Sequence, residues 1–260
     1  MVSGIDAAAT GMIAQQLNID VISNNLANVN TAGFKELIPV FKNISDIDLK
    51  EKNKDNNLNK DKNIGTISAG STLDSTILDL KQGALKKTDN KLDFAVNGGG
   101  FFAVKTPEGE LYTRDGSFSL SNDGTLVTKD GYPVLGQSGS GIKINTSNTS
   151  IDKLSVNEDG SIFLDKQQLD KLKIVDFSKA TDLTTVGNSL YKPVDSSIKP
   201  TEDKNSKVDQ GFLEGSNSNT IETMINTISA TRTYETLSKV LKATEGTLEK
   251  AVNDVGRVKE

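Results

Sequence analysis

The sequence predicts an α+β protein, in which N- and C-terminal amphipathic helices pair in a coiled-coil-like layer and a central antiparallel β-rich domain lies between them. Apolar residues recur at helical spacing near both ends of the 260-residue chain. The middle instead shows short β-type runs separated by Asp-Gly pairs, which are typical of hairpin turns. We therefore divide the chain into an N-terminal assembly helix (1–35), a variable extended or mobile segment (36–80), the central β-rich domain (81–210) and a C-terminal assembly helix (211–260).

The N-terminal helix is predicted over residues 3–30. Ser3 with Asp6 is typical of an N-cap, and Gly33 indicates the end of the helix. One row of mostly apolar residues follows the helix at alternating spacings of three and four: Ile5, Ala8, Met12, Gln15, Ile19, Ile22, Leu26 and Val29. This spacing is typical of a seam between two helices. Its candidate subunit contacts are Ile5, Met12, Ile19, Ile22 and Leu26.

The C-terminal helix is predicted to start after Asn219, which forms a capping-box pattern with Glu222. A first apolar stripe comprises Ile221, Met224, Ile225 and Ile228. A second comprises Tyr234, Leu237, Leu241, Thr244, Leu248, Ala251, Val255 and Val258. The phase slips between residues 228 and 234, so one uninterrupted seam is not expected. The candidate subunit contacts in these two stripes are Ile221, Ile225, Ile228, Tyr234, Leu237, Leu241 and Leu248.

The middle of the chain is predicted to consist of strands and turns. Segment 50–63 contains a single apolar residue, Leu58, and is expected to be a mobile loop. Strands are predicted at 101–104, 126–127, 161–164 and 173–177. Hairpin turns are predicted at Asp115-Gly116, Asp123-Gly124, Asp130-Gly131 and Asp159-Gly160. The glycine run 98–100 precedes a strand, so we expect a close backbone approach there and no phosphate site.

Composition excludes several classes of function. The chain contains no cysteine and no histidine, which excludes Ser-His-Asp and Cys-His catalysis and His- or Cys-based metal sites. A net charge of −5 argues against nucleic acid. No stretch reaches the ~20 apolar residues of a membrane span, and the N-terminus shows no cleavable secretory signal. We expect no enzyme activity, no cofactor, no metal, no small-molecule substrate and no membrane insertion.

The two terminal helices predict assembly. A lone two-helix pair would leave much of each apolar face in water, and burial against copies of the same chain would cover these faces. Asn24, Asn25 and Asn28 are unusual near the end of a helix, because asparagine is a poor helix former. Their amides are predicted to hydrogen-bond across a subunit contact. The alternative is a solvated polar face before the end of the helix.

Three motifs then resemble one family. They are Asn-Asn-Leu-Ala-Asn-Val-Asn-Thr-Ala-Gly-Phe-Lys at 24–35, the two middle segments 97–102 and 112–118, and Gln-Gly-Phe-Leu-Glu-Gly-Ser-Asn at 210–217 followed by Arg-Thr-Tyr-Glu at 232–235. In this order they resemble the signatures of the flagellar rod and hook axial protein family. The length is similar to basal-body rod proteins of the FlgF and FlgG type. Ser218 departs from the valine frequent in the family.

The resemblance implies a structural subunit that polymerises through its terminal helices into a hollow, torque-transmitting rod. The implied partners are copies of the chain, neighbouring flagellar rod and hook proteins, and the flagellar export apparatus. The implied location is the flagellar basal body, across the periplasm or cell wall, after export without a cleaved signal.

Three alternatives stay open at this point. A hook-type axial protein belongs to the same family. A secreted β-rich adhesin or carbohydrate-binding module would use the middle of the chain but gives the terminal stripes no role. A carboxylate-based cell-wall hydrolase would require activity that is lost when one acidic pair is replaced.

Overall fold

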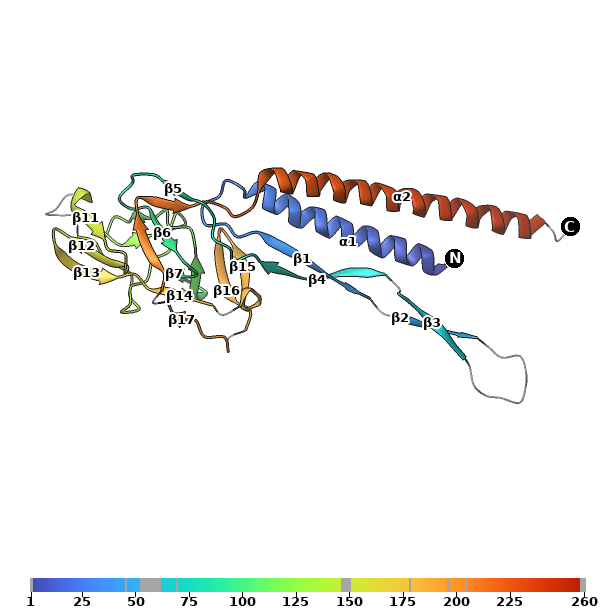
Figure 1. Ribbon diagram of the computed structural model, residues 1–260, viewed down its shortest axis with the longest axis horizontal. Coiled ribbons are helices and arrows are strands. Elements are labelled where there is room, and N and C mark those ends of the chain that lie inside the picture. The colour runs from blue at the N-terminus through green and yellow to red at the C-terminus, as the bar shows by residue number, and fades with distance from the viewer. Residues whose placement is uncertain are drawn as a thin grey trace. The chain divides into compact units, whose positions relative to one another are not determined.

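The structure is a computed structural model that describes residues 2–44, 46–51, 62–68, 70–145, 151–177, 179–195, 197–203 and 205–257. It confirms the α+β class: in chain order, α1 (Val2–Ala27) precedes and α2 (Thr220–Arg257) follows a β-rich region (Figure 1). The chain forms two compact units. Unit 1 comprises Met1–Asn24, Pro39–Thr76 and Ile221–Glu260, and unit 2 comprises Asn25–Ile38 and Ile77–Thr220.

Unit 1 contains both helices and a β-ribbon. The helices lie side by side in opposite directions, so the start of α1 and the end of α2 lie at the same end of the pair (Figure 1). A Cβ built on Gly11 would lie 3.4 Å from Leu237 Cδ1, which places these residues at the contact between α1 and α2. Strand β1 (Leu37–Asn43), which lies mostly in this unit, pairs with β4 (Ser71–Leu78), and β2 (Asp46–Glu51) pairs antiparallel with β3 (Lys62–Ser68).

Unit 2 is built on an antiparallel six-stranded sheet of order β15-β16-β8-β7-β14-β17. Its strands are β7 (Phe101–Thr106), β8 (Gly109–Thr113), β14 (Ile174–Asp176), β15 (Leu183–Gly187), β16 (Leu190–Pro193) and β17 (Thr201–Glu202). The smaller sheets pair β5 (Leu85–Lys87) with β19 (Phe212–Glu214), β6 (Phe94–Asn97) with β18 (Lys207–Gln210), β9 (Ser119–Leu120) with β10 (Leu126–Val127), and β12 (Ser161–Leu164) with β11 (Leu154–Val156) and β13 (Gln167–Lys171).

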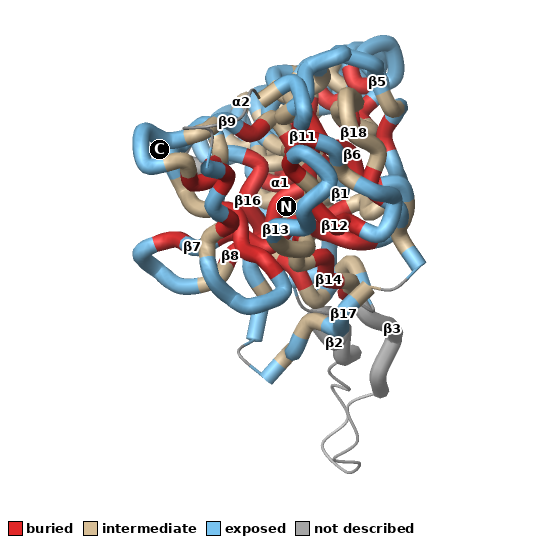
Figure 2. Tube along the Cα trace, turned by 90° about the vertical axis from the view of Figure 1, so that its left-hand side faces the viewer, coloured by how far each residue is buried: buried red, intermediate tan, exposed pale blue. Residues whose placement is uncertain are grey.

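The core of unit 2 lies on the two faces of this sheet. Successive residues of a strand point to opposite faces, and β7 shows this directly. Phe102 and Val104 belong to one buried apolar cluster, whereas Phe101 and Ala103 belong to another. Figure 2 shows the buried residues gathered along the strands of this region. The uninterrupted apolar run Phe-Phe-Ala-Val is therefore explained by a strand that is covered on both sides.

Most of the predicted elements are confirmed. All four predicted strands exist, as β7, β10, β12 and β14. Gly124, Gly131 and Gly160 have φ of +77°, +82° and +83°, as the predicted turns require. The turn predicted at Asp115-Gly116 is wrong, because Gly116 instead packs its backbone against Phe94. A Cβ there would lie 1.7 Å from the Phe94 carbonyl oxygen.

Two of the predicted elements are corrected and the start of a third is confirmed. Helix α1 begins at Val2, so Ser3 is not its N-cap, and α1 ends at Ala27, with turns at the asparagine-rich residues that follow. Helix α2 begins at Thr220, directly after the predicted Asn219 cap. The loop predicted at 50–63 is too long, because Lys50 pairs with Asn63 and Glu51 with Lys62 in the β2–β3 ribbon. Residues 52–61 lie outside the described residues. Among the described helices, none combines the length and apolarity of a membrane span.

Candidate functional site

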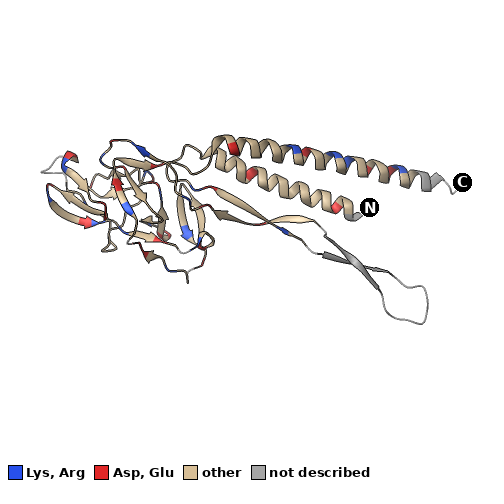
Figure 3. Ribbon diagram, viewed as in Figure 1, with Lys and Arg blue, Asp and Glu red and all other residues tan. Residues whose placement is uncertain are grey.

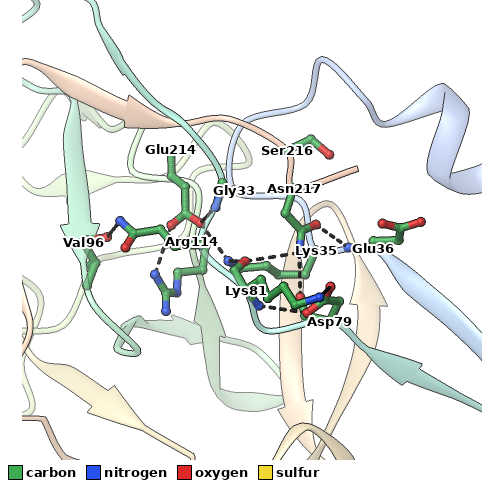
Figure 4. A network of polar contacts seen from close by, with 12 residues as sticks. Gly33, Lys35, Glu36, Asp79, Lys81, Val96, Arg114, Glu214, Ser216 and Asn217 are labelled. Atoms are coloured by element: carbon green, nitrogen blue, oxygen red, sulfur yellow. Dashed lines mark hydrogen bonds and ion pairs between the residues drawn. The ribbon is translucent and has the colours of Figure 1, made fainter. Parts of the chain in front are cut away.

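A buried ionic cluster lies where the segment after α1 meets the segment before α2, within unit 2. Lys35 Nζ donates to Glu214 Oε1 over 2.7 Å and to the Lys81 carbonyl oxygen over 2.6 Å. The Gly83 N–H donates to the same Glu214 oxygen over 2.8 Å. Arg114 Nη1 donates to Glu214 Oε2 over 3.0 Å. One carboxylate therefore binds two cations and a backbone amide (Figure 4).

Gly33 brings the chain into this cluster. It has φ +67°, which favours glycine, and a Cβ there would lie 2.2 Å from the Asp115 amide nitrogen. The Gly33 N–H donates to the Glu214 carbonyl oxygen over 2.8 Å. Two residues later the Lys35 N–H donates to Tyr191 Oη over 3.1 Å, and this hydroxyl donates to the Gly33 carbonyl oxygen. The backbone turn at Gly33 thus directs Lys35 inward.

Burial controls the electrostatics of the cluster. The side chains of Lys35, Arg114 and Glu214 are at most 1 % exposed. Burial lowers the pKa of Lys35 and that of Arg114, and the Glu214 carboxylate opposes both shifts. Arg114 also lies 4.7 Å from the centre of the Phe101 ring, and Nη2 donates to the Gly98 carbonyl oxygen over 2.8 Å. Removing Glu214 would leave two buried cations without an anion, which is the costly way to break such a pair.

Two asparagines complete the junction. Asn25 Nδ2 donates to the Leu37 carbonyl oxygen over 2.8 Å, and the Leu37 N–H donates back to Asn25 Oδ1 over 3.0 Å. Asn217 Oδ1 accepts from the Glu36 N–H over 2.7 Å. Asn25 is buried and its amide is used inside the chain, so the amide that was predicted at a subunit contact has an internal role. Asn24 is exposed and Asn28 is half-buried, and their role between subunits stays a prediction.

Sequence reasoning missed this cluster. Lys35, Arg114 and Glu214 are far apart in the chain, and charged residues in a sequence are usually solvated. The available signal was that each of the three lies inside one of the three family-like motifs. Each motif supplies one side chain to the same buried cluster. The three motifs therefore meet at one structural junction.

The exposure of residues along α2 explains the phase slip predicted between residues 228 and 234. Its less exposed residues form a row with spacings of three and four: Thr223, Thr227, Ala230, Tyr234, Leu237, Leu241, Thr244 and Leu248. Threonine and alanine continue the row where the apolar pattern breaks. Ile221, Ile225 and Ile228 lie on another side of the helix and are 71 %, 60 % and 55 % exposed. With Met224, which is 50 % exposed, they form an exposed apolar stripe.

The residues predicted on α1 are more covered. Ile22 is buried, whereas Ile5, Met12, Ile19 and Leu26 are half-buried. An exposed row lies on another side of the helix and contains Asp6, Ile13, Gln16 and Asp20. Ile13 is 60 % exposed and was not predicted, because it lies off the apolar row. The sequence signal for Ile13 was one large apolar residue on a side of the helix whose other members are polar.

Among the described residues, no three acidic side chains gather in a group that could hold a metal ion. A surface cavity of about 540 Å³ in unit 2 is lined by groups including Asp159, Lys171 and Glu202. Hydrogen bonds from Ser161 lower the pKa of Asp159, so this carboxyl stays ionised and is unsuited to act as the general acid of a hydrolase.

A buried junction built from three separated motifs in unit 2, and exposed apolar helical faces in unit 1, are typical of a structural subunit. Family models match residues 5–35 (flagella basal body rod protein), 95–164 (flagellar hook protein FlgE/F/G D1 domain) and 209–254 (flagellar basal body rod FlgEFG protein C-terminal). The chain is 34 % identical to the flagellar basal-body rod protein FlgG of Buchnera aphidicola subsp. Schizaphis graminum, over 96 % of this chain and 98 % of that protein.

Two further relatives agree. The flagellar basal-body rod protein FlgG of Bacillus subtilis is 32 % identical over 97 % of this chain and 99 % of its own length. The flagellar basal-body rod protein FlgF of Rhizobium meliloti is 32 % identical over 98 % and 99 %. The chain belongs to the flagellar basal-body rod protein family. It is a structural subunit of the flagellar basal body, and the hook-type alternative is not better supported.

Proposed function

We propose that the chain polymerises through its terminal helices into a hollow rod that transmits torque. In this proposal the four predicted segments act as they were assigned from the sequence. Segments 1–35 and 211–260 are the assembly helices, which pair in a coiled-coil-like layer. Membership of the family implies assembly with other rod and hook proteins. Copies of the chain itself, and export through the flagellar apparatus without a cleaved signal, are further parts of the proposal.

The exposed apolar stripe of α2 is the observation that carries this proposal. Burying one isoleucine side chain contributes about 1.5–3 kcal/mol, so its three isoleucines form a strong association surface. In a heterologous contact that repeats without closing, each copy gives one face and receives another, and a helical filament results. Asn24 extends the exposed polar part of the proposed interface at the end of α1.

The ionic cluster supports assembly indirectly. It fixes the segment that leaves α1 to the segment that enters α2, through Lys35 and Glu214. We assign Lys35, Arg114 and Glu214 as positioning residues, because a repeating contact requires every copy to present its helices in the same way.

Charged substitutions in the apolar stripe test the proposal. Cells that carry Ile221→Asp, Ile225→Asp and Ile228→Asp together should lose rods and swimming, while the purified variant melts as the parent does. Val194→Asp is the matched control, since Val194 is 61 % exposed but lies in unit 2. Swimming cells with intact rods in the triple variant would contradict the proposal.

A further inference from the structure

The exposed row of α1 presents a simple pattern of charge. Asp6, Ile13 and Asp20 are seven residues apart, which is nearly two helical turns, so they lie on one side about 10 Å from one another. All three are exposed. Helix α1 contains no lysine or arginine (Figure 3). This side therefore offers an apolar centre between two negative charges.

The apolar stripe of α2 continues into a groove with the opposite charge. The groove has a volume of about 460 Å³ and is lined by Ile225, Ile228, Ser229, Arg232, Thr233, Thr236 and Leu237. Arg232 follows Ile225 by seven residues, the same spacing as Asp6 to Ile13. Within the described ranges Arg232 makes no salt bridge, and it is exposed. A cation next to an apolar groove favours an acidic apolar helix as the occupant.

Pairing inside one chain uses another side of α1 and only the Leu237 edge of the α2 groove. Gly11 marks the side of α1 that faces Leu237 of the same chain. Ile13 is two residues further on, about 200° around the helix, and therefore points away from that contact. The exposed row of α1 can therefore reach an α2 groove only on another molecule.

We propose that the α1 row of one copy lies in the α2 groove of the next copy, with Ile13 against Ile225 and Ile228 and Asp6 paired with Arg232. This inference rests on the proposed polymerisation. Copies repeated along one filament axis share a direction, and α1 and α2 run in opposite directions within each copy (Figure 1). The contact between copies is therefore antiparallel. With Ile13 opposite Ile225, this direction places Asp6, and not Asp20, opposite Arg232.

Thiol crosslinking tests the register, because the chain contains no cysteine of its own. Cells that carry one copy with Ile13→Cys and another with Ile225→Cys, treated with a short bismaleimide, should yield a crosslinked dimer from isolated basal bodies. The control pairs Asp20→Cys with Ile225→Cys, since Asp20 lies about 10 Å along the same side. Crosslinking of the control alone would overturn the proposed register.

A charge swap tests the ion pair. Arg232→Glu should reduce rod number and swimming by roughly tenfold, because it places two negative charges together at the contact. Asp6→Arg in the same chain should restore both, whereas Asp20→Arg should not. Restoration by Asp20→Arg would contradict the antiparallel register. A third outcome separates this inference from the proposed function. Neither Asp6→Arg nor Asp20→Arg restores swimming and Ile13→Cys does not crosslink, but charged substitutions in the apolar stripe still abolish rods. Another rod protein then fills the groove, so this inference fails while the proposed function stands.

Discussion

Replacing Glu214 tests whether the buried cluster holds unit 2 together. Glu214 Oε1 accepts from Lys35 Nζ and the Gly83 N–H, and Oε2 accepts from Arg114 Nη1. In Glu214→Gln, one of these donor groups faces the new NH₂, which accepts nothing. Both cations also lose their counter-ion in a site that is almost inaccessible to water. Breaking a buried pair in this way costs about 3–5 kcal/mol.

Thermal unfolding followed by circular dichroism measures this cost. About 2–4 °C is lost per kcal/mol in a domain of 150–250 residues, so the midpoint should fall by roughly 6–20 °C. Glu158→Gln is the control, because Lys207 Nζ lies 2.7 Å from Glu158 Oε2 but the two side chains are 62 % and 70 % exposed. An exposed pair of the same length should change the midpoint little. Lys35→Met should cost less than Glu214→Gln, since it leaves Glu214 paired with Arg114.

Equal shifts in the Glu214 and Glu158 variants would refute this reasoning. They would show that burial does not amplify the loss, and that the three motifs are not held together by charge. A midpoint that falls in Glu214→Gln and falls further in Lys35→Met would also contradict it, because the order follows from the number of unpaired buried charges.

Three further results are expected. Asn25→Ala leaves the backbone groups of Leu37 without side-chain partners and should lower the free energy of unfolding in urea by about 1–3 kcal/mol. Gly33→Ala should destabilise far more than Gly131→Ala in the same titration; both have positive φ, but a Cβ meets open space only at Gly131. Burial raises the pKa of Tyr191 above its ordinary value near 10. The neutral Tyr191 side chain therefore stabilises the fold fully below pH ~10, and this contribution is lost as the pH rises above that value. Tyr191→Phe should weaken the dependence of unfolding on alkaline pH. It should also remove one late step from the tyrosinate absorbance titration.

The sequence predicted the elements of the fold well where the local pattern was sufficient. The run Phe101 to Val104 is apolar enough to be a strand wherever it lies, and Gly124 follows an aspartate in a turn pattern that needs no distant contact. Gly116 also follows an aspartate, but it does not form a hairpin turn. The backbone of Phe94, which is 22 positions earlier in the chain, lies against it. Such an approach leaves no local trace.

The candidate site was less predictable for the same reason. Lys35 and Glu214 are 179 positions apart, and neither residue alone indicates burial. The exposed α2 stripe was identified, but its relation to the second stripe was not. Thr227 and Ala230 continue the less exposed row of the helix without being strongly apolar. A contact between copies, such as the one proposed for Ile221, Ile225 and Ile228, is a property of the assembly, and its partner is not encoded in the local pattern of the stripe.

Electron microscopy of isolated basal bodies is the most direct test of the central claim. A three-dimensional reconstruction with the chain labelled at Val194, an exposed residue outside the helices, should show label repeated along the rod. It should also show α1 and α2 packed between copies, with the apolar stripe of α2 buried. Label confined to the hook or absent from the axial structure, or a rod in which Ile225 and Ile228 remain exposed, would contradict the account.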